Sequence, residues 1–259
     1  MRVLITGASR GIGRALARRL ADDGRFPELH LALGGASHPE ALNALGEELR
    51  PKVDNVIPVV GDLADPTTPE RLINEVLSAL GGLDAIVSNA GIGKPHSLLD
   101  ATLEQWDRVL NINLRATWLL AKAAYPALRE SEGHIITVSS LSGVAPQPDM
   151  GAYSVAKSGL IMLTRLMAQE WAADRIRANC VSPGFVVTEM TQAAYADDAF
   201  RRAREAHVPV GRLADPGDDI AGVVAFLLSD DARYCNGQNF VVDGGVTDSI
   251  LRVLPRRSQ

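Results

Sequence analysis

The first 24 residues constrain the fold of this chain more than any other segment. They read MRVLITGASRGIGRALARRLADDG, which is a short apolar run, a glycine-rich turn and an amphipathic run with helical periodicity. Gly7, Gly11 and Gly13 let the backbone turn tightly and approach a ligand closely, and the helix that follows offers its N-terminal amides and dipole to negative charge. The spacing G-x-x-x-G-x-G meets the general nucleotide fingerprint G-x-G-x-x-G only loosely. We therefore expect a phosphate-binding turn, with a purely structural turn as the alternative.

Short apolar runs alternate with longer amphipathic ones along the rest of the chain. This order is typical of a parallel sheet with helices on both faces. Thr102 and Gln105 have the spacing of a capping box, which predicts a long helix ending near Leu128. Right-handed crossovers would give an α/β, doubly wound, Rossmann-like fold with seven parallel strands. The predicted strands cover residues 2–6, 29–33, 55–60, 84–89, 134–139, 177–182 and 239–244.

A single domain accounts for nearly the whole sequence. At 259 residues, with 46% hydrophobic and 22% charged residues, the chain can bury a large core without dividing. We place this domain at residues 1–248 and expect residues 249–259 to form a partly disordered tail.

Composition also argues against several classes of function. No run approaches the ~20 apolar residues needed to cross a bilayer, and Met1 leads directly into a predicted strand, so we expect a cytoplasmic protein. Cys180 and Cys235 lack metal-ligand spacing, so we expect reduced packing thiols and no metal site. The formal net charge of −5, without a dense basic run, argues against nucleic acid as the main partner.

Tyr153 and Lys157, in the run GAYSVAKSG, are the strongest candidates for catalysis. Their spacing of four places both side chains on one face of a helix. A cation roughly 4 Å from a phenol, at an effective dielectric of ~20, contributes about 4 kcal/mol, enough to lower a tyrosine pKa by a few units from about 10. We therefore expect Tyr153 to exchange a proton near neutral pH, with accidental spacing as the alternative.

Eight markers in order along the sequence resemble the short-chain dehydrogenase/reductase family from Val3 to about Val246. Ser88 is one departure, since the family more often has another asparagine there. The markers are Thr6-Gly7-Ala8-Ser9-Arg10-Gly11-Ile12-Gly13, Asp62-Leu63, Asn89-Ala90-Gly91, Asn113, Ser140, Tyr153 with Lys157, and Pro183-Gly184 with Thr188, followed by Val242-Asp243-Gly244-Gly245.

The resemblance implies an NAD(P)(H)-dependent oxidoreductase acting on a carbonyl or secondary alcohol, with four catalytic side chains. Tyr153 would be the general acid or base, and Lys157 would lower its pKa and hold the nicotinamide ribose. Ser140 would polarise the substrate carbonyl, and Asn113 would hold a water that links Lys157 to solvent. Ser139 is the neighbour that could be mistaken for Ser140, but adjacent strand residues face opposite ways and the family's spacing selects Ser140.

The same resemblance implies the cofactor contacts. The stretch LGGASHPE has no acid before Glu40 to accept bonds from a ribose 2′-hydroxyl, and Arg10 lies where NADP-preferring members carry a base. We therefore favour NADP(H), with Ser37 as an added donor and NAD(H) as the alternative. The predicted cofactor-binding residues are Gly7, Ser9, Arg10, Gly11, Ile12, Gly13, Ser37, Asp62, Leu63, Asn89, Ala90, Gly91, Tyr153, Lys157, Pro183, Val186 and Thr188.

Substrate identity is open at this level. Residues 189–210 are expected to form a substrate lid with Met190, Tyr195 and Phe200 as apolar contacts, ordinary surface helix being the alternative. General likeness is nearest to 3-oxoacyl-acyl carrier protein reductases, but Glu130 and Glu132 do not favour docking of an acidic carrier. A small free ketone or secondary alcohol is the alternative substrate. Lys94, His96 and Gln147 are then candidate substrate contacts, or simply loop surface.

Two further expectations concern partners. A protein that binds NADP without turnover, as a sensor or scaffold, is the alternative of another class, and such proteins usually lose the tyrosine or the lysine. Apolar residues on more faces than a sheet can cover predict that two helices find a partner. These residues are Trp106, Trp118, Leu160, Met162 and Trp171. The family resemblance implies that these helices pair with their copies in a second subunit, as a dimer or a homotetramer.

Overall fold

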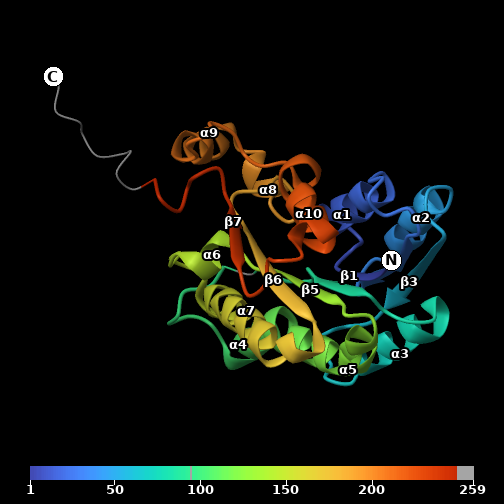
Figure 1. Ribbon diagram of the computed structural model, residues 1–259. Coiled ribbons are helices and arrows are strands. Elements are labelled where there is room, and N and C mark those ends of the chain that lie inside the picture. Colours follow the sequence, from blue (N-terminus) through green and yellow to red (C-terminus); the bar gives the residue numbers. More distant parts are fainter. Residues whose placement is uncertain (94, 250–259) are drawn as a thin grey trace.

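All seven predicted strands are present, and they form one parallel sheet (Figure 1). The computed structural model describes residues 1–93 and 95–249. Strand ends differ from the predicted bounds by two residues at most. The strands are β1 (Arg2–Thr6), β2 (His30–Gly35), β3 (Asn55–Val60), β4 (Ala85–Ser88), β5 (His134–Val138), β6 (Arg177–Pro183) and β7 (Asn239–Val242).

The order of the strands fixes where a ligand can bind. It is β3-β2-β1-β4-β5-β6-β7, so the chain winds outward from β1 in one direction and then continues from β4 in the other. The crossovers on the two sides of this reversal diverge, and a crevice therefore opens beyond the carboxyl ends of β1 and β4. This confirms the predicted doubly wound fold.

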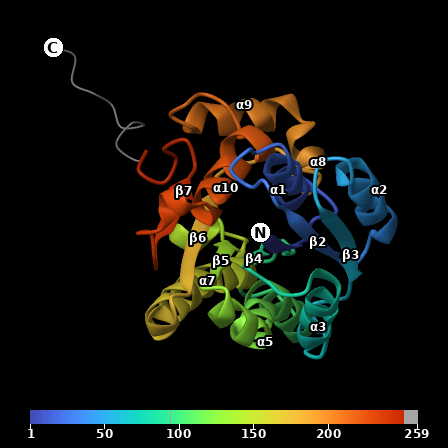
Figure 2. The same ribbon diagram turned by 45° about the vertical axis from the view of Figure 1, so that its right-hand side comes forward.

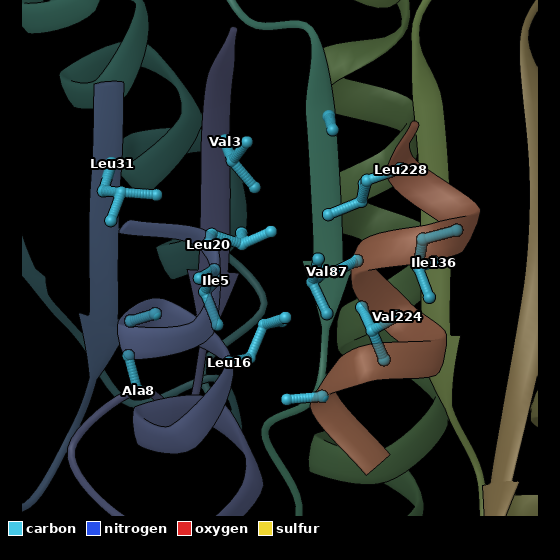
Figure 3. Packing of buried hydrophobic residues seen from close by; sticks show 14 of the residues in the cluster. Val3, Ile5, Ala8, Leu16, Leu20, Leu31, Val87, Ile136, Val224 and Leu228 are labelled. Atoms are coloured by element: carbon cyan, nitrogen blue, oxygen red, sulfur yellow. The ribbon is translucent and has the colours of Figure 1, made fainter. Parts of the chain in front are cut away.

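Helices cover both faces of the sheet because its strands are apolar on both sides. Val3 and Ile5 of β1 pack against one layer of helices (Figure 3). Leu4 between them packs against the other layer. The first layer consists of α1 (Gly11–Ala21), α2 (Pro39–Leu49) and α10 (Gly222–Leu228) (Figure 2). The second consists of α3 (Thr68–Leu80), α5 (Ala116–Glu130) and α7 (Gly151–Glu170).

The long helix predicted from Thr102 is confirmed at its start and interrupted in its middle. Thr102 and Gln105 form both hydrogen bonds of a capping box. The helix then passes from α4 (Leu103–Leu110) through one π-helical turn, η1 (Asn111–Arg115), into α5. Within this turn the Asn113 side chain donates 2.9 Å to the carbonyl of Val109. The wider turn aims Asn113 into the protein instead of along a regular helix face.

Short elements complete the described chain. They include α8 and α9, which lie within residues 189–210 and are seen in the upper part of Figures 1 and 2. These elements are α6 (Leu141–Val144), α8 (Gln192–Tyr195), α9 (Asp198–His207), the second π-turn η3 (Pro216–Ala221), and the 3-10 turns η2 (Ala172–Asp174) and η4 (Asp230–Ala232).

Burial corrects part of the predicted apolar face. Trp118 on α5 and Met162 on α7 are exposed as expected, at 46% and 54%. Leu160 is instead buried, and Trp171 packs against the core beside Tyr125, with ring centroids 5.1 Å apart. Leu160 therefore belongs to the buried side of α7, and Trp171 packs inward just after the end of that helix.

Some predictions concern residues outside the described ones. Lys94 is one, and nearly all of the predicted tail is another, since the description ends at residue 249. None of the helices between residues 1 and 249, leaving aside residue 94, is both long and apolar enough to cross a membrane.

Candidate active site

The glycine turn between β1 and α1 forms one end of a cleft at the strand reversal. Gly7 and Gly11 have φ angles of +68° and +55°, in the left-handed region that favours glycine. A Cβ on Gly13 would lie 2.4 Å from the Gly7 carbonyl oxygen, so only glycine lets α1 start this close to the strand. Gly11 and Ile12, the first residues of α1, line the cleft. Free N-terminal amides and a helix dipole at this point suit an anionic ligand.

The cleft has a volume of about 260 Å³ and continues from the turn to α7. It collects most of the predicted cofactor residues, although they come from six separate stretches of sequence. Those that line it are Gly7, Ser9, Arg10, Gly11, Ile12, Ser37, Asp62, Leu63, Asn89, Ala90, Gly91, Tyr153, Lys157 and Thr188.

Thr6 and Asn89 tie the two strands at the reversal together. The Thr6 hydroxyl oxygen accepts hydrogen bonds from the amides of Asn89, at 3.1 Å, and Ala90, at 3.0 Å. In return the Asn89 carboxamide donates 2.9 Å to the Thr6 carbonyl. These bonds hold the floor of the cleft and explain why polar residues end both strands.

Asn113 lies directly behind this floor. It is 1% exposed, and its Nδ2 also donates to the Ile92 carbonyl at 3.0 Å. A Cβ on Gly91 would come 2.5 Å from Asn113 Oδ1 and 3.4 Å from Lys157 Nζ, so all three residues meet at one point. Asn113 Oδ1 has no hydrogen-bond partner among the described residues. A buried acceptor of this kind needs a donor, which suits an ordered water.

Lys157 is a buried cation at the wall of the cleft. It is 4% exposed, and its Nζ donates 2.7 Å to the Val138 carbonyl at the end of β5. Burial lowers the pKa of Lys157 from 10.5 to about 8, because the charged amine loses water. The amine is still mostly protonated at neutral pH and keeps two donors for a ligand.

Tyr153 and Lys157 do face the same space, but the expected effect on the tyrosine is not found. The Lys157 Nζ lies 5.7 Å from the centre of the Tyr153 ring. Burial is the largest influence and raises the pKa of Tyr153, while a hydrogen bond from Ser140 lowers it by less. The prediction from the sequence considered the effect of the cation and left out the burial of the phenol. In the folded protein, desolvation of the phenolate sets the direction of the shift.

The two serines after β5 divide as the spacing predicted. Ser140 interacts with Tyr153 and accepts a bond from the Ser142 amide at 3.1 Å. Ser139 points the other way, and its hydroxyl donates 2.8 Å to the Lys157 carbonyl. Ser139 therefore supports α7 and leaves Ser140 as the hydroxyl beside the phenol.

The part of the cleft that follows β2 fits a ribose phosphate. Gly35, Ala36, Ser37 and His38 line it, and no carboxylate follows the strand before Glu40. Asp62 also lines the cleft and pairs with Arg108 at 3.1 Å. Asp62 binds the Ala64 amide in a local turn, so it is not the cap of α3, which begins at residue 68.

Several predicted residues lie off the wall of the cleft. Gly13 packs on the turn, Asn113 is buried, Ser140 is half-buried, and Pro183 and Val186 are buried at or just after the end of β6. Of the candidate substrate contacts, Met190 lines the cleft. Among the candidates within the described residues, His96, Gln147, Tyr195 and Phe200 do not line it.

The cleft also contains residues that the sequence argument missed. His38 and Arg108 had no motif to mark them, and Glu189 was counted only as part of the lid. Thr6 was a marker without an assigned role. Within residues 1–93 and 95–249, no three His, Cys, Asp or Glu side chains are grouped so that they could hold a metal ion.

Comparison with known proteins places this chain in a large group of enzymes. A family profile described as enoyl-(acyl carrier protein) reductase matches residues 7–247. The 3-oxoacyl-(acyl-carrier-protein) reductase FabG of Staphylococcus aureus is 37% identical over 244 residues, which is 94% of this chain and 96% of that protein. Dehydrogenase/reductase SDR family member 4 of Sus scrofa is 34% identical and covers 95% of this chain and 87% of its own length.

Solved structures agree with this relationship. A protein from Beutenbergia cavernae, provisionally described as an NAD(P)-dependent gluconate 5-dehydrogenase with NADP bound at low occupancy, is 34% identical. It has a TM-score of 0.88 over 96% of this chain and 97% of its own. A gluconate 5-dehydrogenase from Burkholderia cenocepacia, in complex with NADP and tartrate, is 30% identical with a TM-score of 0.88 over 96% of both chains.

Proposed function

Because this chain belongs to the short-chain dehydrogenase/reductase family of oxidoreductases, we propose that it transfers hydride between NADP(H) and a small carbonyl or secondary alcohol substrate. One observation carries the proposal. Tyr153 and Lys157 line the same cleft as the glycine turn, so an acid–base group and an anion cradle serve one bound molecule. NAD(H) is the alternative cofactor.

The residues of the cleft fit a dinucleotide. Gly7 and Gly11 leave the backbone without side chains where a diphosphate would approach, and Gly13 lets α1 begin close to the turn. Arg10 is exposed at the start of α1, and Ser37 lines the cleft beyond β2, so both are placed to bind a 2′-phosphate. Two of the similar structures were solved with NADP, which favours this cofactor.

Tyr153 would give its proton to the carbonyl oxygen during reduction and take it back during oxidation. A raised pKa keeps this phenol protonated, and Ser140 would donate a second hydrogen bond to the same oxygen. The ammonium of Lys157, with two donors left, would orient the ribose and stabilise negative charge on the phenol. A water on Asn113 Oδ1 would replace the proton from solvent through Lys157. Bound nicotinamide would supply or accept the hydride, and the backbone of Val186 and the side chain of Thr188 would hold its carboxamide.

The substrate class has two candidates. The gluconate dehydrogenases among the similar structures favour a small polar ketone or alcohol. The 37% identity to a 3-oxoacyl-(acyl-carrier-protein) reductase favours a carrier-bound 3-oxoacyl group instead. Glu132 and Glu130 disfavour an acidic carrier, although Glu132 is paired with Arg175 at 2.6 Å. Turnover of a free ketone compared with its carrier-bound thioester separates the two.

A homo-oligomer is part of the proposal. Trp118 on α5 and Val155, Met162 and Leu166 on α7 leave apolar surface in water, which favours pairing of these helices with a second copy. Sedimentation velocity would show a dimer or tetramer, and Met162→Glu should shift it toward monomer.

A carbonyl and alcohol screen with NADPH and NADH, followed by the absorbance of the reduced nicotinamide, tests the proposed reaction. Tyr153→Phe should lower kcat by about 10²–10⁴-fold and leave cofactor affinity nearly unchanged. Tyr234→Phe is the matched control, because Tyr234 is fully exposed. Binding of NADPH without turnover of any substrate, and no effect of Tyr153→Phe, would instead support a sensor or scaffold.

A further inference from the structure

Glu189 lies at the positive end of α1. Its Oε2 accepts a hydrogen bond from the Gly11 amide at 2.8 Å, and its Oε1 lies 3.2 Å from Nη1 of Arg14. Glu189 belongs to the segment between β6 and α8, so this contact joins the start of the lid to the glycine turn. The segment is closely packed there, since a Cβ on Gly11 would lie 3.4 Å from the Thr188 side chain.

The same groups are the ones that a diphosphate would use. Gly11 opens α1, where free amides and the helix dipole favour one negative charge. Arg14 adds a single free nitrogen, because its Nε and Nη2 already donate to the Ser9 carbonyl. A carboxylate and a diphosphate at this point repel each other, and one amide hydrogen cannot serve both at full strength.

Thr191 forms hydrogen bonds with main-chain groups in the neighbouring part of the same segment. Its hydroxyl donates 2.7 Å to the Val186 carbonyl and accepts 3.0 Å from the Thr188 amide. These are main-chain groups next to the proposed position of the nicotinamide carboxamide. The segment therefore already forms hydrogen bonds within the protein at both points where a cofactor would contact it, at Glu189 and at Thr191.

We propose that Glu189 sets the affinity of the cofactor site by competing with the diphosphate for the Gly11 amide and Arg14. Binding of the cofactor then releases the Glu189 carboxylate and frees the start of the lid. This inference rests on the proposed function, because it requires NADP(H) in the cleft. The opposite arrangement, in which Glu189 stays in place as a strut and helps to position the cofactor, predicts the reverse effect of removing its charge.

The test compares Glu189→Gln with the matched control Glu205→Gln. Glu205 lies on α9 of the same lid and pairs with Arg201 at 2.9 Å, outside the cleft. NADPH is titrated into each protein and followed by intrinsic fluorescence. Glu189→Gln should lower the Kd for NADPH by about two- to fivefold, which is the range for one charge at a helix end. Glu205→Gln should leave the Kd unchanged.

A second readout uses the protein without cofactor. Exchange of the Gly11 amide hydrogen, measured by NMR, should be faster in Glu189→Ala than in the wild type, because the acceptor is gone. Equal or weaker NADPH binding by Glu189→Gln overturns the competition, and unchanged Gly11 exchange overturns the contact. If neither the wild type nor the variant binds NADPH or NADH, the proposed function falls and the competition falls with it.

Discussion

Lys157→Met should remove a rise in stability that the wild-type protein shows at alkaline pH. The buried amine has its pKa lowered from 10.5 to about 8, so in the folded protein it loses its proton first. Between these two pH values the unfolded chain binds more protons than the folded one, and the free energy of unfolding therefore increases with pH. The burial penalty is fully present below about pH 8 and is relieved as the pH approaches 10.5.

The size of the effect follows from the same two values. Their difference corresponds to about 3 kcal/mol, of which about 2 kcal/mol is regained between roughly pH 7 and pH 10. Methionine has a similar length and no proton to lose, so it should not show this rise. The substitution also removes the amine that donates 2.7 Å to the Val138 carbonyl. That loss changes the free energy of unfolding by the same amount at every pH, so it does not affect the slope.

Urea unfolding, followed by circular dichroism at a series of pH values and one protein concentration, measures the difference. The stability of the wild type minus that of Lys157→Met should rise by about 2 kcal/mol over this range. Lys122→Met is the control, because Lys122 is exposed on α5, and its difference should stay level. A level or falling difference for Lys157 would refute the assignment of its lowered pKa to burial.

Three further predictions follow from contacts in the cleft. Thr6→Val removes the acceptor of two main-chain amides at a position 1% exposed, and should lower the free energy of unfolding by about 2–4 kcal/mol in urea. Gly13→Ala should abolish detectable NADPH binding in a fluorescence titration, because its Cβ would press on the Gly7 carbonyl, whereas Gly46→Ala, with 4.0 Å of room, should bind normally. Arg10→Ala should reduce kcat/KM with NADPH about tenfold and leave that with NADH unchanged, and an equal loss with both would show that Arg10 does not bind the 2′-phosphate.

The fold could be predicted closely because its signals are local. Each strand is a short apolar run, and the strand–turn–helix start carries its glycines in sequence, so neither needs knowledge of distant residues. The helix from Thr102 is an instructive exception. Its capping box is local and was confirmed, but the π-turn around Asn113 depends on a bond to the Ile92 carbonyl, which the sequence does not place nearby.

The residues that form the candidate site were predicted better than the pKa of Tyr153. Fourteen of the predicted cofactor-binding residues line one cleft, because the ends of parallel strands meet at one edge of the sheet. The pKa of Tyr153 was predicted in the wrong direction, since spacing on a helix says nothing about how much water reaches the phenol. Glu189 was missed because its partner Gly11 lies 178 positions away in the chain.

What the sequence alone determined is therefore the set of elements and the chemistry of the side chains at their ends. Backbone preference, apolar period and the bare backbone of glycine act over a few residues, so they can be recognised without a structure. Only the tertiary structure decided which polar groups contact one another and how far they are buried from water. Examples are the burial of Lys157 and the hydrogen bond from the Gly11 amide to Glu189. Desolvation and charge pairing depend on distance in space, and distance in space is set by packing of the whole domain.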